Sequence, residues 1–180
     1  MILMLGTPGA GKTTQTRLLA ERLDCKWFSM GELIRSSVSG QDRSEMLAGK
    51  IIGDEVTLQI VDKALSSFKP ATQECVFEGN PRSIPQARWW INQINNDRFS
   101  VRGLIHLVAD PKVAEARMVA RGRLDDHDDN VIDRRFEEYH KSIAPTLDFL
   151  KNHGVDVYEI DANGTIEEVE KAIDRALGVV

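Results

Sequence analysis

One eight-residue stretch near the amino terminus constrains the fold of this chain more than any other feature. The stretch GTPGAGKT, residues 6–13, fits the pattern G-x-x-x-x-G-K-[ST] at every position. In such a loop the glycines let backbone N–H groups turn toward phosphate oxygens, and the following helix adds the positive end of its dipole. Lys12 would reach the outer phosphates and Thr13 would ligate Mg²⁺. The motif therefore predicts a phosphate-binding loop for a nucleoside triphosphate, placed between a strand and a helix.

The sequence around the loop meets that requirement. An apolar run over residues 1–5 predicts a buried strand, and leucines at helical spacing predict a helix over residues 14–23. The same patterns predict strands over 26–28, 74–78, 102–109 and 155–160, and helices over 31–38, 43–48, 54–68, 83–94, 110–121, 131–152 and 166–177. Asp110 is expected to cap its helix, and Pro145 to bend or interrupt the helix over 131–152.

Five short strands that alternate with helices are typical of a parallel sheet wrapped on both faces. The sequence therefore predicts an α/β fold, a three-layer P-loop domain of residues 1–180 around a five-stranded parallel sheet. A dinucleotide-binding fold is set aside, because Lys12 stands in the glycine loop and no acidic residue ends the second predicted strand.

Composition excludes several other classes of protein. The formal net charge is −5 and no basic run is present, which argues against a nucleic-acid partner. No stretch approaches the roughly 20 apolar residues of a membrane span, and the first apolar run is too short for a signal peptide. Cys25 and Cys75 form no C-x-x-C pair, so neither a disulfide framework nor a thiolate zinc site is indicated. We expect a cytoplasmic monomer that acts on small molecules.

Arginines then recur at positions that suit a second phosphate. The segment GELIR, residues 31–35, places Arg35 on a helix soon after the second strand. The segment EGNPRSIPQA, residues 78–87, places Arg82 just past the third strand, at the edge where doubly wound sheets bind ligands. Two such separated guanidinium groups are able to clamp one phosphate. A further cluster contains Arg117, Arg121, Arg123, Arg134 and Arg135.

Taken in order, these motifs resemble those of the adenylate kinase family of nucleoside monophosphate kinases over nearly the whole chain. The matching segments are residues 6–15, 31–35, 49–55, 78–86, 117–126 and 138–145. The resemblance implies a small insert that binds the monophosphate, over about residues 29–58, and a very short lid over about residues 121–130. Only Gly122 separates Arg121 from Arg123, where relatives with a long lid carry a small domain that sometimes holds zinc. The zinc ligands are absent here.

The family resemblance implies Mg²⁺-dependent phosphoryl transfer from ATP to AMP, giving two ADP. A monophosphate is already largely a dianion at neutral pH, so its attacking oxygen needs no general base. Catalysis then depends on aligning two anions and neutralising their charge, a task that suits guanidinium groups. The alternatives are a kinase for CMP, UMP or another nucleoside monophosphate, and a nucleotide-binding module whose turnover has degenerated.

The resemblance also implies individual roles. Phosphate contacts during transfer are assigned to Lys12, Arg82, Arg121, Arg123 and Arg135. ATP would contact Gly9, Ala10, Gly11, Lys12, Thr13, Thr14, Arg117, Arg121 and Gly164. AMP would contact Ser29, Met30, Arg35, Lys50, Ile52, Gly79, Arg82 and Gln86. Mg²⁺ would bind Thr13 and, through water, Glu78. Arg134 is the alternative to Arg135, because one residue is inserted between Asp126 and this helix.

Three positions depart from the family pattern. Glu78 stands where the family usually has Asp, which keeps the charge but moves it by one methylene. Asn80 replaces a common aromatic residue, and Met30 replaces a threonine that contacts the adenine of AMP. Met30 therefore argues against AMP, whereas Gln86 in the segment PRSIPQA argues for it.

Overall fold

The computed structural model describes residues 1–37, 52–66, 68–69, 73–122 and 129–179, and its elements alternate as the sequence predicts. The strands are β1 (Ile2–Gly6), β2 (Lys26–Ser29), β3 (Cys75–Glu78), β4 (Gly103–Val108) and β5 (Val157–Asp161). The helices are α1 (Lys12–Arg22), α2 (Met30–Ser37), α4 (Asp54–Leu65), α5 (Ile84–Asn95), α6 (Pro111–Arg121), α7 (Asp129–Asn152) and α8 (Ile166–Leu177). The predicted helix over residues 43–48 lies outside the described residues.

The five strands form one sheet in the order β2-β3-β1-β4-β5, and every pair is parallel. The predicted fold class is confirmed. Central strand β1 is paired on both edges, with Leu3 opposite Phe77 of β3 and Leu104 of β4. Because all strands point the same way, the loops that follow them emerge at a single edge of the sheet.

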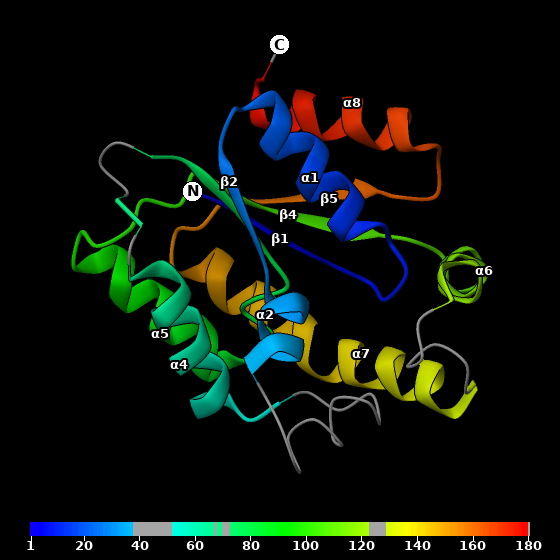
Figure 1. Cartoon of the computed structure of the whole chain (residues 1–180), viewed down its shortest axis with the longest axis horizontal. Coiled ribbons are helices and arrows are strands. Elements are labelled where there is room, and N and C mark those ends of the chain that lie inside the picture. The colour runs from blue at the N-terminus through cyan, green and yellow to red at the C-terminus, as the bar shows by residue number, and fades with distance from the viewer. Residues whose placement is uncertain (38–51, 67, 70–72, 123–128, 180) are drawn as a thin grey trace.

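The sheet is covered on both faces, and β1 contributes alternate residues to each (Figure 1). Ile2 and Met4 pack with residues of α1 and α8, including Leu19. Leu3 and Leu5 pack on the other face, with residues of α4, α5 and α7. Side chains alternate across a strand, so a continuous apolar run is what a strand buried on both faces requires.

Two details of the helices differ from the sequence-based expectations. Helix α7 runs through Pro145, where a bend or an interruption was expected, and the expectation of an interruption is wrong. Ile143 and Leu147, on either side of the proline, are buried in the core and hold the helix in place. Asp110 precedes α6 as predicted, but its side chain makes no capping hydrogen bond. Within the described residues, no helix has the length and apolar character needed to cross a membrane.

Candidate active site

A cavity of about 730 Å³ opens at the carboxyl edge of the sheet, and the candidate site residues surround it. Its wall includes the loop after β1, the amino-terminal part of α2, the segment after β3, and residues of α6, α7 and α8. Every predicted site residue within the described part of the chain lines it: Gly9, Ala10, Gly11, Lys12, Thr13, Thr14, Ser29, Met30, Arg35, Ile52, Glu78, Gly79, Arg82, Gln86, Arg117, Arg121, Arg135 and Gly164. Lys50 and Arg123 lie outside the described residues.

The phosphate loop has the backbone that its glycines predict. Gly9 and Gly11 adopt φ values of +74° and +85°, which side-chain-bearing residues rarely adopt. A Cβ on Gly9 would also lie 2.3 Å from the carbonyl oxygen of Ala114, so the loop packs against α6 only with glycine there. Gly11 directly precedes α1, and the amino-terminal end of this helix faces the cavity. This arrangement presents backbone N–H groups and a helix dipole to an anion.

Lys12 folds back over the loop. Its ammonium donates hydrogen bonds to the carbonyl oxygens of Gly6, at 3.0 Å, and of Thr7, at 2.7 Å. The pKa of Lys12 is lowered from 10.5 to about 7, and burial is the largest cause. The positive charges of Arg82, Arg121 and Arg135 contribute to this fall, and only the carboxylate of Glu78 opposes it. The site therefore concentrates positive charge that a bound polyanion would neutralise.

Thr13 and Glu78 meet beside the loop. The Thr13 hydroxyl donates to the two carboxylate oxygens of Glu78, each at 3.1 Å, although 65 positions separate these residues in the sequence. Glu78 ends β3 and is only 6% exposed. A hydroxyl and a carboxylate are the hard oxygen ligands that Mg²⁺ prefers, and both face the cavity that Lys12 lines. The donor set fits Mg²⁺ carried in with a nucleotide.

The opposite part of the cavity holds the predicted monophosphate residues. Arg82 donates from Nε to the carbonyl oxygen of Gly79 at 2.8 Å, which aims its guanidinium from the loop after β3. Burial lowers the pKa of Arg82, and Arg135 lowers it further while Glu78 raises it. Arg35 reaches the same cavity from α2. Guanidinium groups from two separate elements therefore face one space, as two-point binding of a phosphate requires.

Gln86 also lines this part of the cavity. Its side chain belongs to a hydrogen-bonded cluster that the sequence did not predict. Its side-chain oxygen accepts from Asn80 Nδ2 at 2.7 Å and from the backbone N–H of Arg82 at 2.8 Å. Its Nε2 donates to Asp54 at 2.8 Å, and the hydroxyl of Ser83 donates to the same oxygen at 2.6 Å. The one sequence signal of this cluster was Asn80, which departs from the family pattern.

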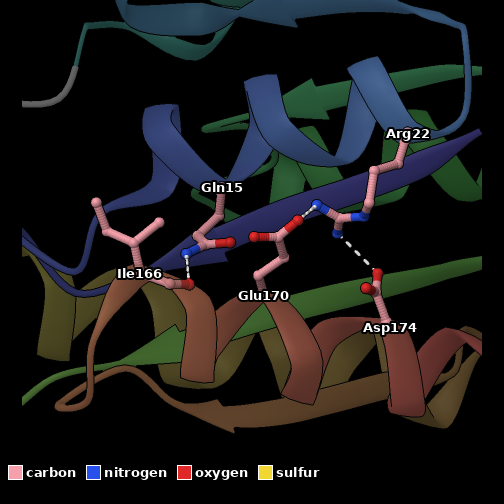
Figure 2. Close-up of polar contacts among 5 residues, drawn as sticks. All are labelled: Gln15, Arg22, Ile166, Glu170 and Asp174. Carbon is pink, nitrogen blue, oxygen red and sulfur yellow. Dashed lines mark hydrogen bonds and ion pairs between the residues drawn. The ribbon is translucent and has the colours of Figure 1, made fainter.

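Hydrogen bonds join α6, α1 and the loop before α8 at the part of the cavity where ATP is predicted to bind. Arg117 of α6 donates to the carbonyl oxygens of Ala162, at 2.7 Å, and of Gly164, at 2.9 Å. Gln15 of α1 donates to the carbonyl oxygen of Ile166 at 2.9 Å, as Figure 2 shows. These bonds fix the loop after β5 against the helix that begins at the phosphate loop.

A second contact between α1 and α8 lies farther from the cavity. Arg22 forms an ion pair with Asp174 at 2.7 Å and another with Glu170, as Figure 2 shows. The three side chains are about one quarter exposed, so solvent screens the pairs only in part. The contact holds α1 and α8 together on this face of the sheet.

Helix α7 supplies the remaining wall of the cavity. It carries both candidates for the last phosphate contact, Arg134 and Arg135, which differ in where they lie. Arg135 and Tyr139 line the cavity, whereas Arg134 is exposed and does not line it. The hydroxyl of Tyr139 contacts Nε2 of His106, and burial raises the pKa of Tyr139 to about 12. Sequence reasoning missed Tyr139, because a tyrosine in a long helix carries no local signal that it borders a cavity.

Comparisons with known proteins agree on one family. A family model described as "Adenylate kinase" matches residues 4–155. The adenylate kinase of Prochlorococcus marinus (strain MIT 9211) is 34% identical over 185 residues, covering 99% of this chain and 97% of that protein. The adenylate kinase of Corynebacterium diphtheriae is 32% identical over 183 residues, covering 98% of each. That of Synechococcus sp. (strain CC9902) is 31% identical over 182 residues, covering 98% of this chain and 97% of that protein.

Proposed function

The chain belongs to the adenylate kinase family, and from this we infer that it is a nucleoside monophosphate kinase that transfers the terminal phosphoryl group of ATP to AMP. One observation carries the proposal most directly. The phosphate loop, with Lys12, and the arginine pair Arg35 and Arg82 line the same cavity, so two phosphate-bearing substrates can meet there. The relatives named above are all adenylate kinases, and the pyrimidine alternative is not favoured.

In the proposed mechanism, Lys12 and the backbone of the phosphate loop bind the outer phosphates of ATP, while Arg35 and Arg82 hold the phosphate of AMP. The AMP phosphate attacks as a dianion, so no residue has to remove a proton. Arg121 and Arg135 neutralise charge on the phosphoryl group in transit. Thr13 and, through water, Glu78 would hold Mg²⁺, which supplies charge neutralisation on the ATP phosphates when bound.

The remaining parts of the proposal concern the base sites and the moving segments. Arg117 and the backbone near Gly164 would hold the adenine of ATP, while Met30, Ile52 and Gln86 would border the base of AMP. The proposed insert, about residues 29–58, and the proposed lid, about residues 121–130, fall partly outside the described residues. We further propose a monomer in the cytoplasm, which sedimentation of the purified chain and fluorescence localisation would test.

The deciding experiment is a coupled assay with ATP and each of AMP, CMP, UMP and GMP. We expect AMP to give the highest kcat/KM, and a better second monophosphate would contradict the assignment. Tight binding of ATP without transfer to any monophosphate would instead indicate a degenerate binding module.

A single variant tests the placing of the two substrates. Arg82→Ala should lower kcat by about 10³-fold, because it removes a guanidinium from the reacting phosphates. ATP affinity measured by calorimetry should stay nearly unchanged. Arg88→Ala is the matched control, since Arg88 is an exposed arginine of α5 outside the cavity. Equal loss of ATP binding and transfer in Arg82→Ala would show that the monophosphate site is misplaced.

A further inference from the structure

The side-chain amide of Gln86 has only one orientation open to it, and Trp90 begins the chain of bonds that sets it. Trp90 Nε1 donates to Asn80 Oδ1 at 2.7 Å. An indole N–H is a donor and never an acceptor, so the oxygen of Asn80 must face Trp90. The Asn80 amide nitrogen therefore faces Gln86, and it donates to Gln86 Oε1 at 2.7 Å. Trp90 and Asn80 are both fully buried, so no water competes for these bonds.

Two further bonds complete the assignment. The backbone N–H of Arg82, again a donor only, points at Gln86 Oε1 at 2.8 Å. Gln86 Nε2 donates to the Asp54 carboxylate at 2.8 Å. If the Gln86 amide were turned over, two donors would face its nitrogen and a carboxylate would face its oxygen. The network thus settles the oxygen and nitrogen positions by donor and acceptor chemistry alone.

This orientation determines what Gln86 can offer to a ligand. A carbonyl oxygen has two lone pairs, and Asn80 and Arg82 already occupy both. One of the two N–H groups on Nε2 is used by Asp54, which leaves a single N–H donor. Gln86 is 1% exposed but lines the cavity, as do Met30 and Ile52, the other residues proposed to border the AMP base. An unpaired donor at such depth needs a hydrogen-bond acceptor from the ligand.

We propose that Asn80 is a specificity-determining positioning residue, which fixes Gln86 so that the base of the monophosphate is recognised through one N–H donor and not through a donor and acceptor pair. The inference rests on the proposed function and deepens it. Bases with an acceptor nitrogen on the Watson–Crick edge, such as N1 of adenine or N3 of cytosine, satisfy this donor. Guanine, hypoxanthine and uracil carry an N–H at that position and oppose it.

Base analogues test the inference on the unmodified enzyme. Purine riboside 5′-monophosphate lacks the 6-amino group of AMP but keeps N1, and we expect its kcat/KM to stay within about 3-fold of the AMP value. 1-Deazaadenosine 5′-monophosphate keeps the amino group but lacks N1. It leaves the Gln86 N–H buried and unpaired, and we expect a loss of about 5- to 150-fold.

The outcomes separate this inference from the proposed function. If AMP is not the best substrate, the proposed function fails first. If AMP is best but removal of the 6-amino group costs as much as removal of N1, the inference fails and the function stands. If neither analogue loses activity, Gln86 does not contact the base, and the inference is likewise overturned.

A variant then tests the part assigned to Asn80. Asn80→Leu keeps the branching and the number of side-chain heavy atoms but releases the Gln86 amide, and we expect the ratio of kcat/KM for AMP over IMP to fall by about 10-fold. The matched control is Ser83→Ala, which removes another polar group of the same cluster without touching Gln86 Oε1. If Asn80 had a purely structural role, the variant would lower kcat/KM for AMP and for IMP equally. An unchanged ratio would therefore refute the assignment.

Discussion

Replacing Lys12 by methionine is expected to stabilise the nucleotide-free protein at neutral pH, although it removes a cation that the proposed reaction requires. In the absence of nucleotide, burial and the positive charges of Arg82, Arg121 and Arg135 lower the pKa of Lys12 from 10.5 to about 7. A lowered lysine pKa means that the folded protein opposes the charged form. Methionine has a similar length and carries no charge, so the substitution removes the energetic cost of holding this charge in the folded protein.

The magnitude follows from the two pKa values. Because one tenfold change in proton affinity corresponds to about 1.4 kcal/mol, a fall from 10.5 to about 7 corresponds to about 5 kcal/mol at most. About 4 kcal/mol of this penalty remains at pH 7, and about 2 kcal/mol remains at pH 9. Water in the cavity screens part of it, and the lost bonds to Gly6 and Thr7 offset about 1 kcal/mol each. The net gain expected for Lys12→Met at pH 7 is about 1 to 2 kcal/mol.

The sign of the pH dependence is fixed by the same values. Between pH 7 and 10.5 the unfolded chain holds a proton on Lys12 that the folded chain has released, so the stability of the unmodified protein rises with pH in this window. The Lys12→Met variant lacks that titration. Its advantage should therefore shrink by about 2 kcal/mol between pH 7 and pH 9.

Urea unfolding at both pH values, in buffer without nucleotide, phosphate or magnesium, measures the difference. Lys112→Met is the matched control, because Lys112 is an exposed lysine on α6. Its effect should stay within about 0.5 kcal/mol and should not change with pH. The reasoning is refuted if Lys12→Met is less stable than the unmodified protein at pH 7, or if the difference is the same at pH 9.

Three other predictions concern the phosphate contacts, the metal and the outer helices. Arg135→Ala should lower kcat by about 10³-fold in steady-state assays, and Arg134→Ala by less than about 3-fold; equal losses would contradict the placing of α7. Glu78→Gln should raise the Mg²⁺ concentration for half-maximal activity by about 10-fold, whereas an unchanged Mg²⁺ titration would exclude its role. Arg22→Ala should cost about 1 kcal/mol in urea unfolding and leave kcat unchanged. Adding Glu170→Ala should then cost less than it does alone, since both changes break one ion pair; strictly additive losses would exclude the pairing.

The sequence by itself determined the features that depend on neighbouring residues. The loop over residues 6–13 is specified by its glycines and its Lys-Thr ending, and the structure places it between β1 and α1 as expected. Helix α8 begins and ends where the sequence predicts, because Thr165 and Glu168 form a capping box and Gly178 ends the helix in the left-handed conformation. Hydrophobic periodicity and helix capping depend on residues only a few positions apart, so the sequence predicts them without knowledge of the fold.

Only the tertiary structure decided which residues distant in the sequence are in contact and how far each is buried from solvent. The contact of Thr13 with Glu78 and that of Gln86 with Asp54 join segments that no local pattern connects. The depressed pKa of Lys12 likewise arises from burial among charges carried by other elements. Long-range proximity and desolvation are properties of the packed chain, and residue spacing does not encode them. The phosphate loop was therefore readable from the sequence, whereas the charge on its lysine and the orientation of Gln86 were not.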